Sequence, residues 1–410
     1  MRTRRCAIVG SGTLIIRPHM HTAIPRRILP AIALSQFAGT SLWFAINAVM
    51  ADLQRESGLP DAAVGWFTAA VQLGFIAGTL AFALWTIADR FSPRRVFLVC
   101  SLAGAACAAL CAWLPPSMGS LIVLRFLTGV SLAGIYPVGM KIAAGWYAQG
   151  LGLALGVLVG ALVLGTALPF GMRAIGASWP WQGVMWAVAA IAALGGVVMA
   201  LWVPDGPHLA PRAKFSPRAL LVIVQDRKVR ASAFGYFGHM WELYAFFVLL
   251  PLIAGARWKS TAAAWWVFAA IAVGALSCVA GGLWARRVGS ERVAAFQLLC
   301  SGGCALLSPW LLDAPAWAWA VWIIVWGATV SGDSPQFSAL TAQNAPRAQV
   351  GSVLTLVNCI GFSISVATIS GFVWLATRLP LAQVLPWLAL GPALGLLCMK
   401  PLLVPAESGK

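Results

Sequence analysis

Ionisable residues interrupt long apolar stretches of this 410-residue sequence, and one of them is the carboxylic acid Glu242. A carboxyl group that is removed from water favours its neutral form, so Glu242 could bind a proton on one side of an apolar barrier and release it on the other. The alternative is a structural carboxylate that bonds to a neighbouring tryptophan or to a backbone amide. We expect a role in proton coupling.

Arg125 is the second such residue. Its guanidinium group is always charged, so it should face a cavity or another helix rather than lipid. It could bind an anionic substrate through two parallel hydrogen bonds. Alternatively, it could tie its helix to a neighbour through carbonyl oxygens or through Glu242. The sequence leaves both interpretations open.

His239 lies one helical turn before Glu242. A proton relay between the two is one interpretation, and a hydrogen-bonded packing residue is the other. The adjacent Met240 adds a weak soft-metal pattern. Because few other metal ligands cluster in the sequence, we expect no metal site and no cofactor.

Asp333 precedes Ser334 and Pro335, and this proline could break a helix there. Its carboxylate could serve a gate or an ion contact, or it could cap a helix at the membrane edge. Further aromatic and polar residues complete a predicted substrate cavity: Trp43, Asn47, Tyr136, Trp241, Tyr244 and Gln336.

The elements that carry these residues must be membrane-spanning helices. The chain is 60% hydrophobic and only 10% charged, against roughly 25% charged residues in soluble domains. Stretches of about 20 apolar residues can cross a hydrocarbon core of about 30 Å, and their backbone must then be helical. We predict twelve spans, at 28–50, 64–88, 96–114, 119–140, 149–171, 181–203, 231–254, 262–284, 293–312, 316–337, 350–374 and 382–404.

The net charge of +17 is explained by membrane orientation rather than by nucleic-acid binding, because the basic residues cluster in a few loops. Most basic residues fall on one side of the predicted spans, in the termini, the central loop and the loops after spans two and eight. Few basic residues fall on the other side: Arg55, Arg173, Arg257, Lys259 and Arg378. Basic loops stay in the cytoplasm, so we predict a multi-pass protein of the inner (plasma) membrane with both termini cytoplasmic.

The first residues imitate a signal peptide, because three arginines precede an apolar run at 6–16. No small-residue cleavage site follows this run. We therefore expect a cytoplasmic basic tail at 1–27, with Met20 as an alternative start.

The two halves of the chain repeat weakly. Residues 88–96 and 285–293 share alanine, two arginines and valine at equivalent places. At nearly the same offset, Trp43 matches Trp241, and a Gly–Pro spacing at 134–137 recurs at 332–335. Two like-oriented six-helix halves around a central site are typical of secondary transporters. We predict bundles at 28–203 and 231–404, a cytoplasmic central loop at 204–230 and a cytoplasmic tail at 405–410.

With these residues in view, the whole chain resembles the major facilitator superfamily. Gly78, Asp89–Arg90 and Arg94–Arg95 resemble the family's signature loop between helices two and three, and 125–129 resembles its fourth-helix motif. The resemblance implies an all-α membrane protein with 12 transmembrane helices in two pseudo-symmetric six-helix bundles. It also implies a gating latch formed by Asp89, Arg90, Arg94 and Arg95. The alternative is that these arginines only enforce topology.

Residues 238–244 are similar to a bacterial branch grouped with nitrate/nitrite and small organic-anion porters. Two departures from the family pattern stand out. Arg286 occupies the place that Asp89 has in the first half, and the glycine-rich span at 149–171 lacks the Gly-Pro pair of drug/proton antiporters. The second departure disfavours drug efflux without excluding it.

We therefore predict a secondary active transporter that carries a small organic or inorganic anion by alternating access. We expect proton-coupled symport, a lipid bilayer and a small-molecule substrate as partners, no nucleic acid, and a monomer. A drug or metabolite efflux antiporter is the alternative. From other classes, a membrane-embedded enzyme would need clustered nucleophiles or metal ligands, and a sensor would need a domain to signal through. The sequence holds no Gly-x4-Gly-Lys-Ser/Thr loop for ATP.

Overall fold

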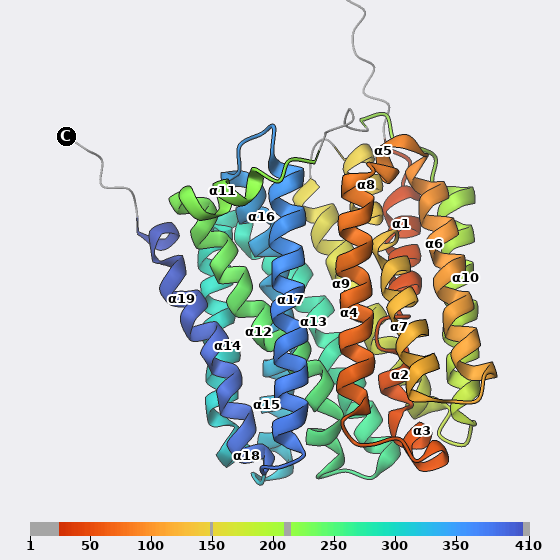
Figure 1. Cartoon of the computed structure of the whole chain (residues 1–410). Helices are drawn as coiled ribbons and strands as arrows, with labels where there is room; N and C mark the ends of the chain where they lie inside the picture. The colour runs from red at the N-terminus through yellow and green to blue at the C-terminus, as the bar shows by residue number, and fades with distance from the viewer. Residues whose placement is uncertain (1–23, 148–150, 209–214, 405–410) are drawn as a thin grey trace, which may run out of the picture.

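A computed structural model describes residues 24–147, 151–208 and 215–404, and every regular element in these ranges is a helix (Figure 1). The predicted tail at 405–410, most of the tail at 1–27 and the alternative start at Met20 lie outside the described residues. The all-α prediction is confirmed for the part of the chain described.

The first half contains the six predicted spans in order. The first is divided into α1 (Ile28–Thr40), α2 (Ala45–Ala48) and α3 (Met50–Ser57). The others are α4 (Ala63–Leu84), α6 (Pro93–Trp113), α7 (Met118–Ala133) with α8 (Tyr136–Trp146), α9 (Leu151–Ile175) and α10 (Trp181–Trp202), and the short α5 (Ile87–Arg90) lies in the loop after α4.

A short helix, α11 (Ala219–Gln225), precedes the second half. The spans that follow are α12 (Arg227–Gly255), α13 (Ser260–Val288), α14 (Ser290–Leu311), α15 (Ala316–Gly332) with α16 (Ser334–Asn344), and α17 (Val350–Ala376). The last span comprises α18 (Leu381–Val384), a 3-10 turn η1 (Leu385–Ala389) and α19 (Leu390–Leu403).

Ten helices in the described residues are long and apolar enough to cross a membrane. One of these ten, Met118–Trp146, comprises α7 and α8 together. The two remaining predicted spans, at 28–50 and 316–337, are divided into helices that are each too short by themselves. With these two the helices number twelve, as the sequence predicts.

The repeat seen in the sequence appears as paired helix breaks. Span four breaks between α7 and α8 just before Pro137, and span ten breaks between α15 and α16 just before Pro335. Both prolines occupy the first turn of the second segment, where the missing N–H costs no helical hydrogen bond. These positions interrupt the helix without an unsatisfied donor.

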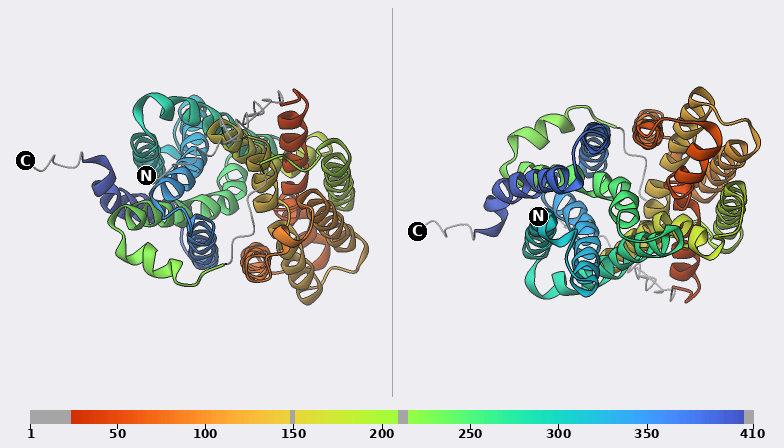
Figure 2. Two further views of the ribbon diagram at one scale, coloured as in Figure 1. Left: turned by 90° about the horizontal axis from the view of Figure 1, so that it is seen from above. Right: turned by 90° about the horizontal axis from the view of Figure 1, so that it is seen from below.

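The two six-helix halves lie side by side (Figure 2). They meet through α9 against α13 and through α4 against α17. At the first contact, Gly160 faces the carbonyl oxygen of Ala275, which would lie 2.9 Å from any Cβ added there. Glycine at this position allows two helices from different halves to approach closely, as small residues do at membrane helix interfaces.

Within the first half, glycines set the distance between α4 and α7. A Cβ at Gly74 would collide with the Phe126 carbonyl oxygen, and one at Gly129 would collide with the Val71 carbonyl oxygen. The contact is therefore reciprocal, with each helix bringing its glycine to the backbone of the other. Gly129 is the last residue of the fourth-helix motif, so the motif has a packing role here.

Replacing Gly74 with alanine is expected to lower the free energy of unfolding by about 1–3 kcal/mol, because α4 and α7 must move apart. The measurement is thermal unfolding of the detergent-solubilised protein. Gly282→Ala on α13 is the matched control, since a Cβ there meets nothing within 4 Å. An equal loss of stability in both variants would show that helix spacing is not the cause.

Candidate functional site

Glu242 lies in the interior of the second half. Its side chain is 1% exposed on α12 and accepts hydrogen bonds from Trp326 Nε1 at 2.6 Å and Ser301 Oγ at 2.8 Å. These partners come from α15 and α14, so Glu242 joins three helices of one bundle. Each carboxylate oxygen has its own donor, which offsets much of the cost of burying this group.

His239 and Asp333 form a second buried group one turn away. His239 Nδ1 lies 2.8 Å from Asp333 Oδ1, and the two side chains are 1% and 0% exposed. Asp333 stands at the break between α15 and α16, the position that the sequence marked through Pro335. The aromatic rings of Tyr236 and Phe337 flank the histidine.

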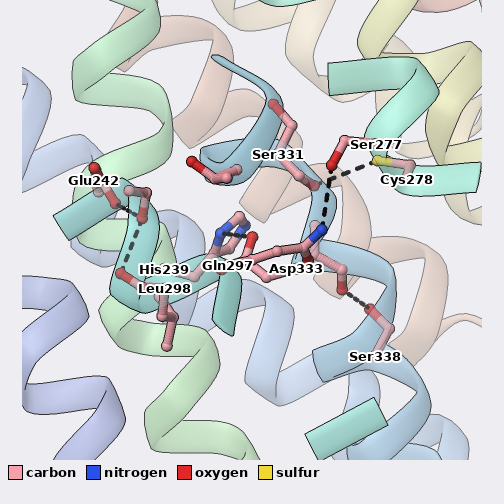
Figure 3. Close-up of polar contacts among 12 residues, drawn as sticks. His239, Glu242, Ser277, Cys278, Gln297, Leu298, Ser331, Asp333 and Ser338 are labelled. Atoms are coloured by element: carbon pink, nitrogen blue, oxygen red, sulfur yellow. Dashed lines mark hydrogen bonds and ion pairs between the residues drawn. The ribbon is translucent and has the colours of Figure 1, made fainter. Parts of the chain in front are cut away.

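The hydrogen bonds of Glu242 and the contact between His239 and Asp333 share no residue (Figure 3). His239 is thus brought to Asp333 rather than to Glu242. A direct His239–Glu242 relay stays a prediction, and the geometry adds Asp333 as the partner that the sequence did not suggest.

Further polar side chains from α13, α14 and α15 extend this interior group. Gln297 Nε2 donates to Ser277 Oγ at 3.2 Å, and Gly332 leaves room for both side chains beside the helix break. Gln297 Oε1 and Ser331 Oγ are buried and lack a hydrogen-bond partner among the described residues. Gln336 is also buried, next to Gly281. Buried orphan atoms of this kind commonly bind water.

Arg125 holds the interrupted first span in place. It is 1% exposed on α7 and donates from Nη1 to the Leu42 carbonyl oxygen at 2.9 Å and from Nη2 to the Trp43 carbonyl oxygen. Both acceptors lie in the turn between α1 and α2. The sequence suggested two possible anchors for Arg125, carbonyl oxygens or Glu242. The hydrogen bonds go to carbonyl oxygens.

Aromatic rings from both halves meet at the centre. Trp43 packs on Phe75 at 5.0 Å, on Phe362 at 5.6 Å and on Tyr244 at 5.9 Å between ring centroids. Phe44 and Phe247 extend the group. We call this set the central aromatic cluster: Trp43, Phe44, Phe75, Tyr244, Phe247 and Phe362. Tyr136 reaches its edge, 6.4 Å from Phe75.

A cavity of about 400 Å³ lies between the two halves. It is at the end of the molecule where α9 and α17 end and α13 begins. Apolar side chains such as Val64, Val248 and Val267 line most of it. Asn47 lines it too, and its Oδ1 is buried without a partner among the described residues, while its Nδ2 donates to Thr68 at 2.8 Å.

Two arginines share one carboxylate at the mouth of this cavity. Asp52 Oδ2 lies 2.7 Å from Arg173 Nη2, and Asp52 Oδ1 lies 3.3 Å from Arg55 Nη1. Asp61 also lines the cavity. Arg55 lies one helical turn after Asp52, so this pairing had a local signal that was missed. Arg173 is far from Asp52 in the chain, and its pairing had no such signal.

The predicted gating residues make contacts inside the first half. Asp89 forms an ion pair with Lys141 on α8, and Arg94 donates to the Ala200 carbonyl oxygen on α10 at 3.2 Å. Arg90 and Arg95 have exposed side chains. These contacts attach the loop after α4 to its own bundle, and a latch to the other half stays a prediction.

The predicted cavity residues therefore separate into different places. Trp43 and Tyr244 lie in the central aromatic cluster and Asn47 lines the cavity, whereas Trp241 packs edge-on against Phe372 and donates to the Trp387 carbonyl oxygen at 3.2 Å. Trp43 and Trp241 match in sequence but differ in role, because span one is interrupted at Trp43 and α12 is continuous at Trp241.

Five residues of the site were not predicted from the sequence: Trp326, Ser301, Gln297, Phe75 and Phe362. A signal existed for two of them, since Gln297 and Ser301 are polar residues four apart in a predicted span and so share one helix face. The described residues contain no group of three or more His, Cys, Asp or Glu side chains that could hold a metal ion.

A family model described as the Major Facilitator Superfamily matches residues 32–370 of the chain. Over 172 residues, the chain is 29% identical to the MFS antiporter QDR3 of Candida albicans. This aligned stretch is 41% of this chain and 23% of that protein. The matching part thus spans less than a quarter of that relative's length. Neither comparison assigns the chain to the nitrate/nitrite branch.

The solved structure of the human organic anion transporter MFSD10 (TETRAN) is similar in fold. It matches with a TM-score of 0.72 over 92% of this chain and 99% of that chain. The sequence identity is 16%, so this likeness concerns the fold alone.

Proposed function

The chain belongs to the Major Facilitator Superfamily, and from this premise we propose that it carries a small organic anion across the membrane together with protons. In this proposal, the bundles at 28–203 and 231–404 rock about a central site and are joined by the loop at 204–230. The central aromatic cluster separates the two sides of the path, and the cavity is the solute's entry.

One observation carries the proposal. A cavity of about 400 Å³ lies between the halves, and both halves contribute residues to its lining. Rocking of one half against the other would change its shape and expose it to the opposite side. The mostly apolar lining supports an organic solute over a small inorganic ion, since binding sites for organic molecules are typically apolar with a few polar groups.

The charge of the solute is inferred from the cavity mouth. Arg55 and Arg173 both reach Asp52, so one carboxylate serves two guanidinium groups. A carboxylate or sulfonate on the solute could pair with either arginine in place of Asp52. Asp61 also lines the cavity, so its two arginines and two aspartates together carry no net charge. An anion would bind by taking the place of Asp52 at one arginine, which favours a solute carrying a single negative charge.

Proton coupling is inferred from the interior of the second half. Glu242, His239 and Asp333 are buried together on α12 and at the α15–α16 break, and α12 also carries Tyr244 of the central aromatic cluster. A change of protonation in this group could therefore alter the position of a helix that lines the path.

An efflux antiporter for drugs or metabolites is the second candidate. The apolar lining supports it, and the Candida albicans relative is named as an MFS antiporter. In symport the protons cross the membrane in the same direction as the solute, and in antiport they cross in the opposite direction.

Proteoliposomes that contain a pH-sensitive dye test both candidates. Aromatic and aliphatic carboxylates, sulfonates, nitrate, phosphate and cationic dyes are added outside in turn. Symport of an organic anion is expected to acidify the lumen, whereas antiport with protons would make it alkaline. Flux without any proton movement, or flux of inorganic anions alone, would contradict the proposal.

Filling the cavity is expected to reduce transport. Ala264 on α13 lines the cavity, and Ala264→Trp should lower uptake at least about tenfold by occupying the space that the solute needs. Uptake into the same proteoliposomes is the measurement. Ala103→Trp on the exposed face of α6 is the control and should retain uptake. Equal uptake by both variants would exclude this cavity from the path.

We also propose the inner membrane as the location, with both termini on the cytoplasmic side. The support is the basic residues near helix ends on one side, such as Arg94, Arg286 and Arg347. Fluorescence of a green fluorescent protein fused to the C-terminus tests this orientation, because that fusion is fluorescent only when it folds in the cytoplasm. Activity of a periplasmic phosphatase fused at the same place would contradict it.

A further inference from the structure

The short helix α11 has two distinct faces. Ala219 and Ile223, four residues apart, are buried against the second half, where α11 packs on α12 and α17. Leu220, Leu221 and Val224 are 46%, 55% and 55% exposed. In a helix these three side chains form one stripe on the side away from the bundle. The outer face of α11 is therefore apolar and has no protein partner among the described residues.

α11 lies at the rim of the second half, outside the ring of spans (Figure 2). Both helices that it contacts end at this level, since α12 begins at Arg227 and α17 begins at Val350. The ends of membrane-spanning helices mark the boundary between hydrocarbon and headgroups. The apolar stripe therefore lies at the level of the lipid headgroups, on the outer side of the bundle.

Exposed cations frame the stripe. Arg218 precedes α11, and Arg227, Lys228 and Arg230 follow it. The acidic residue in this stretch, Asp226, accepts hydrogen bonds from the backbone amides of Lys228 and Val229 and so caps α12. Its charge is directed at a helix start, which leaves the surrounding cations free of an acidic partner among the described residues.

The helix is fixed to the transport machinery at both ends. Arg230 donates to the Val224 carbonyl oxygen at 2.6 Å, which ties the end of α11 to α12. The backbone amide of Ser216 donates to Ser352 Oγ at 3.0 Å, which ties the approach to α11 to α17. α11 is therefore attached to α12, the helix that carries Glu242 and Tyr244.

We infer that α11 and its cations form a binding site for anionic phospholipid on the side of the membrane where this helix lies. The stripe of Leu220, Leu221 and Val224 contacts the upper acyl chains, and Arg218, Arg227 and Lys228 contact the phosphate-containing headgroup. An amphipathic helix with basic residues at its polar boundary binds such a surface through both contributions. The site attaches the linker between the halves, and with it the start of α12, to the bilayer.

Lipid titration followed by native mass spectrometry tests the site on the full chain. The protein in detergent is titrated with dioleoyl phosphatidylglycerol and, separately, with dioleoyl phosphatidylcholine. Wild-type protein is expected to retain the anionic lipid preferentially. The triple variant Arg218→Gln, Arg227→Gln and Lys228→Gln should lose this preference by about tenfold or more, since each basic residue near the surface contributes an attraction of about 1 kcal/mol.

A matched variant controls for total charge. Arg286→Gln, Arg287→Gln and Arg292→Gln remove three exposed cations from the end of α13 and the start of α14 and should change the preference less than about twofold. Unchanged lipid preference in the α11 variant, or an equal loss in the control, would overturn the inference. Displacement of the lipid by equimolar inorganic phosphate would also overturn it, because the site would then bind free phosphate.

Two further variants keep the test decisive if the triple variant does not elute as a single symmetric peak. Lys228→Gln changes one exposed side chain and should weaken retention of phosphatidylglycerol by a few-fold. Leu221→Ser with Val224→Ser retains all cations and should reduce retention of the same lipid through the lost apolar contact. Wild-type retention by both variants would contradict a lipid site at α11. Because lipid binding is measured without substrate, the result does not depend on the proposed function.

Discussion

Replacing Glu242 with glutamine is expected to abolish proton-driven accumulation of the solute while preserving its passive equilibration. For one proton per solute, a gradient of about one pH unit supports accumulation of about tenfold, because one unit corresponds to about 1.4 kcal/mol. The wild-type protein should reach this ratio in proteoliposomes. The Glu242→Gln variant should stop at equal concentrations inside and outside.

Glutamine is a close mimic of the protonated carboxyl group at this site. Its carbonyl oxygen can accept from Trp326 Nε1, and its amide can donate to Ser301 Oγ. The Ser301 hydroxyl can then turn to the Leu298 carbonyl oxygen, which is 3.3 Å away. Every polar atom keeps a partner, so the variant should fold and bind solute but cannot release a proton.

The measurement is the ratio of labelled solute inside and outside at several imposed pH gradients, with exchange at equal pH as the test of intact binding. Glu291→Gln in the first turn of α14 is the matched control, since it removes an acid from the end of a span. His239→Gln and Asp333→Asn address the other titratable groups nearby. Full accumulation by Glu242→Gln would remove Glu242 from the coupling mechanism.

Replacing Arg125 with lysine is expected to destabilise the protein by about 2–4 kcal/mol. Lysine retains the charge but lacks the planar fork, so it cannot donate to both the Leu42 and Trp43 carbonyl oxygens in the same geometry. A buried acceptor left without a donor costs about 1–3 kcal/mol. Loss of this anchor should also let the turn at 41–44 move, and with it Trp43 in the central aromatic cluster.

Thermal unfolding in detergent measures this loss, and solute affinity distinguishes anchoring from substrate binding. Arg378→Lys is the control, because Arg378 is an exposed residue beyond the end of α17 in the second half, where its guanidinium group lies over the Trp374 ring. If Arg125 acts only as an anchor, the affinity of the fraction that stays folded should be unchanged. Wild-type stability combined with a large loss of affinity would instead support direct contact with the solute.

The helical architecture was readable from local properties of the chain. Apolar runs of about 20 residues permit few structures in lipid, because the backbone must bond to itself. Ten of the spans appear as long apolar helices, and the Gly–Pro spacing that repeats near 134 and 332 marks two of the helix breaks. The break after Thr40 has no proline or other local signal, and it was missed.

The candidate site was readable only in part. An ionisable residue inside an apolar run is conspicuous in any sequence, which is why Glu242, Arg125, His239 and Asp333 were found. The sequence suggested a kind of partner for two of them, a tryptophan for Glu242 and carbonyl oxygens for Arg125. Which particular residues pair was not predictable, because a helix can turn about its axis without changing its hydropathy. Only packing determines that Trp326 faces Glu242 and that Asp333 faces His239.

By itself, the sequence determined that the chain is helical, how many helices cross the membrane and which ends are basic, since these follow from the transfer of residues between water and lipid. The tertiary structure decided which buried groups pair, where span one bends and how rings from both halves meet. Such contacts join residues that are far apart in the chain, and their energies depend on distances that no local pattern contains.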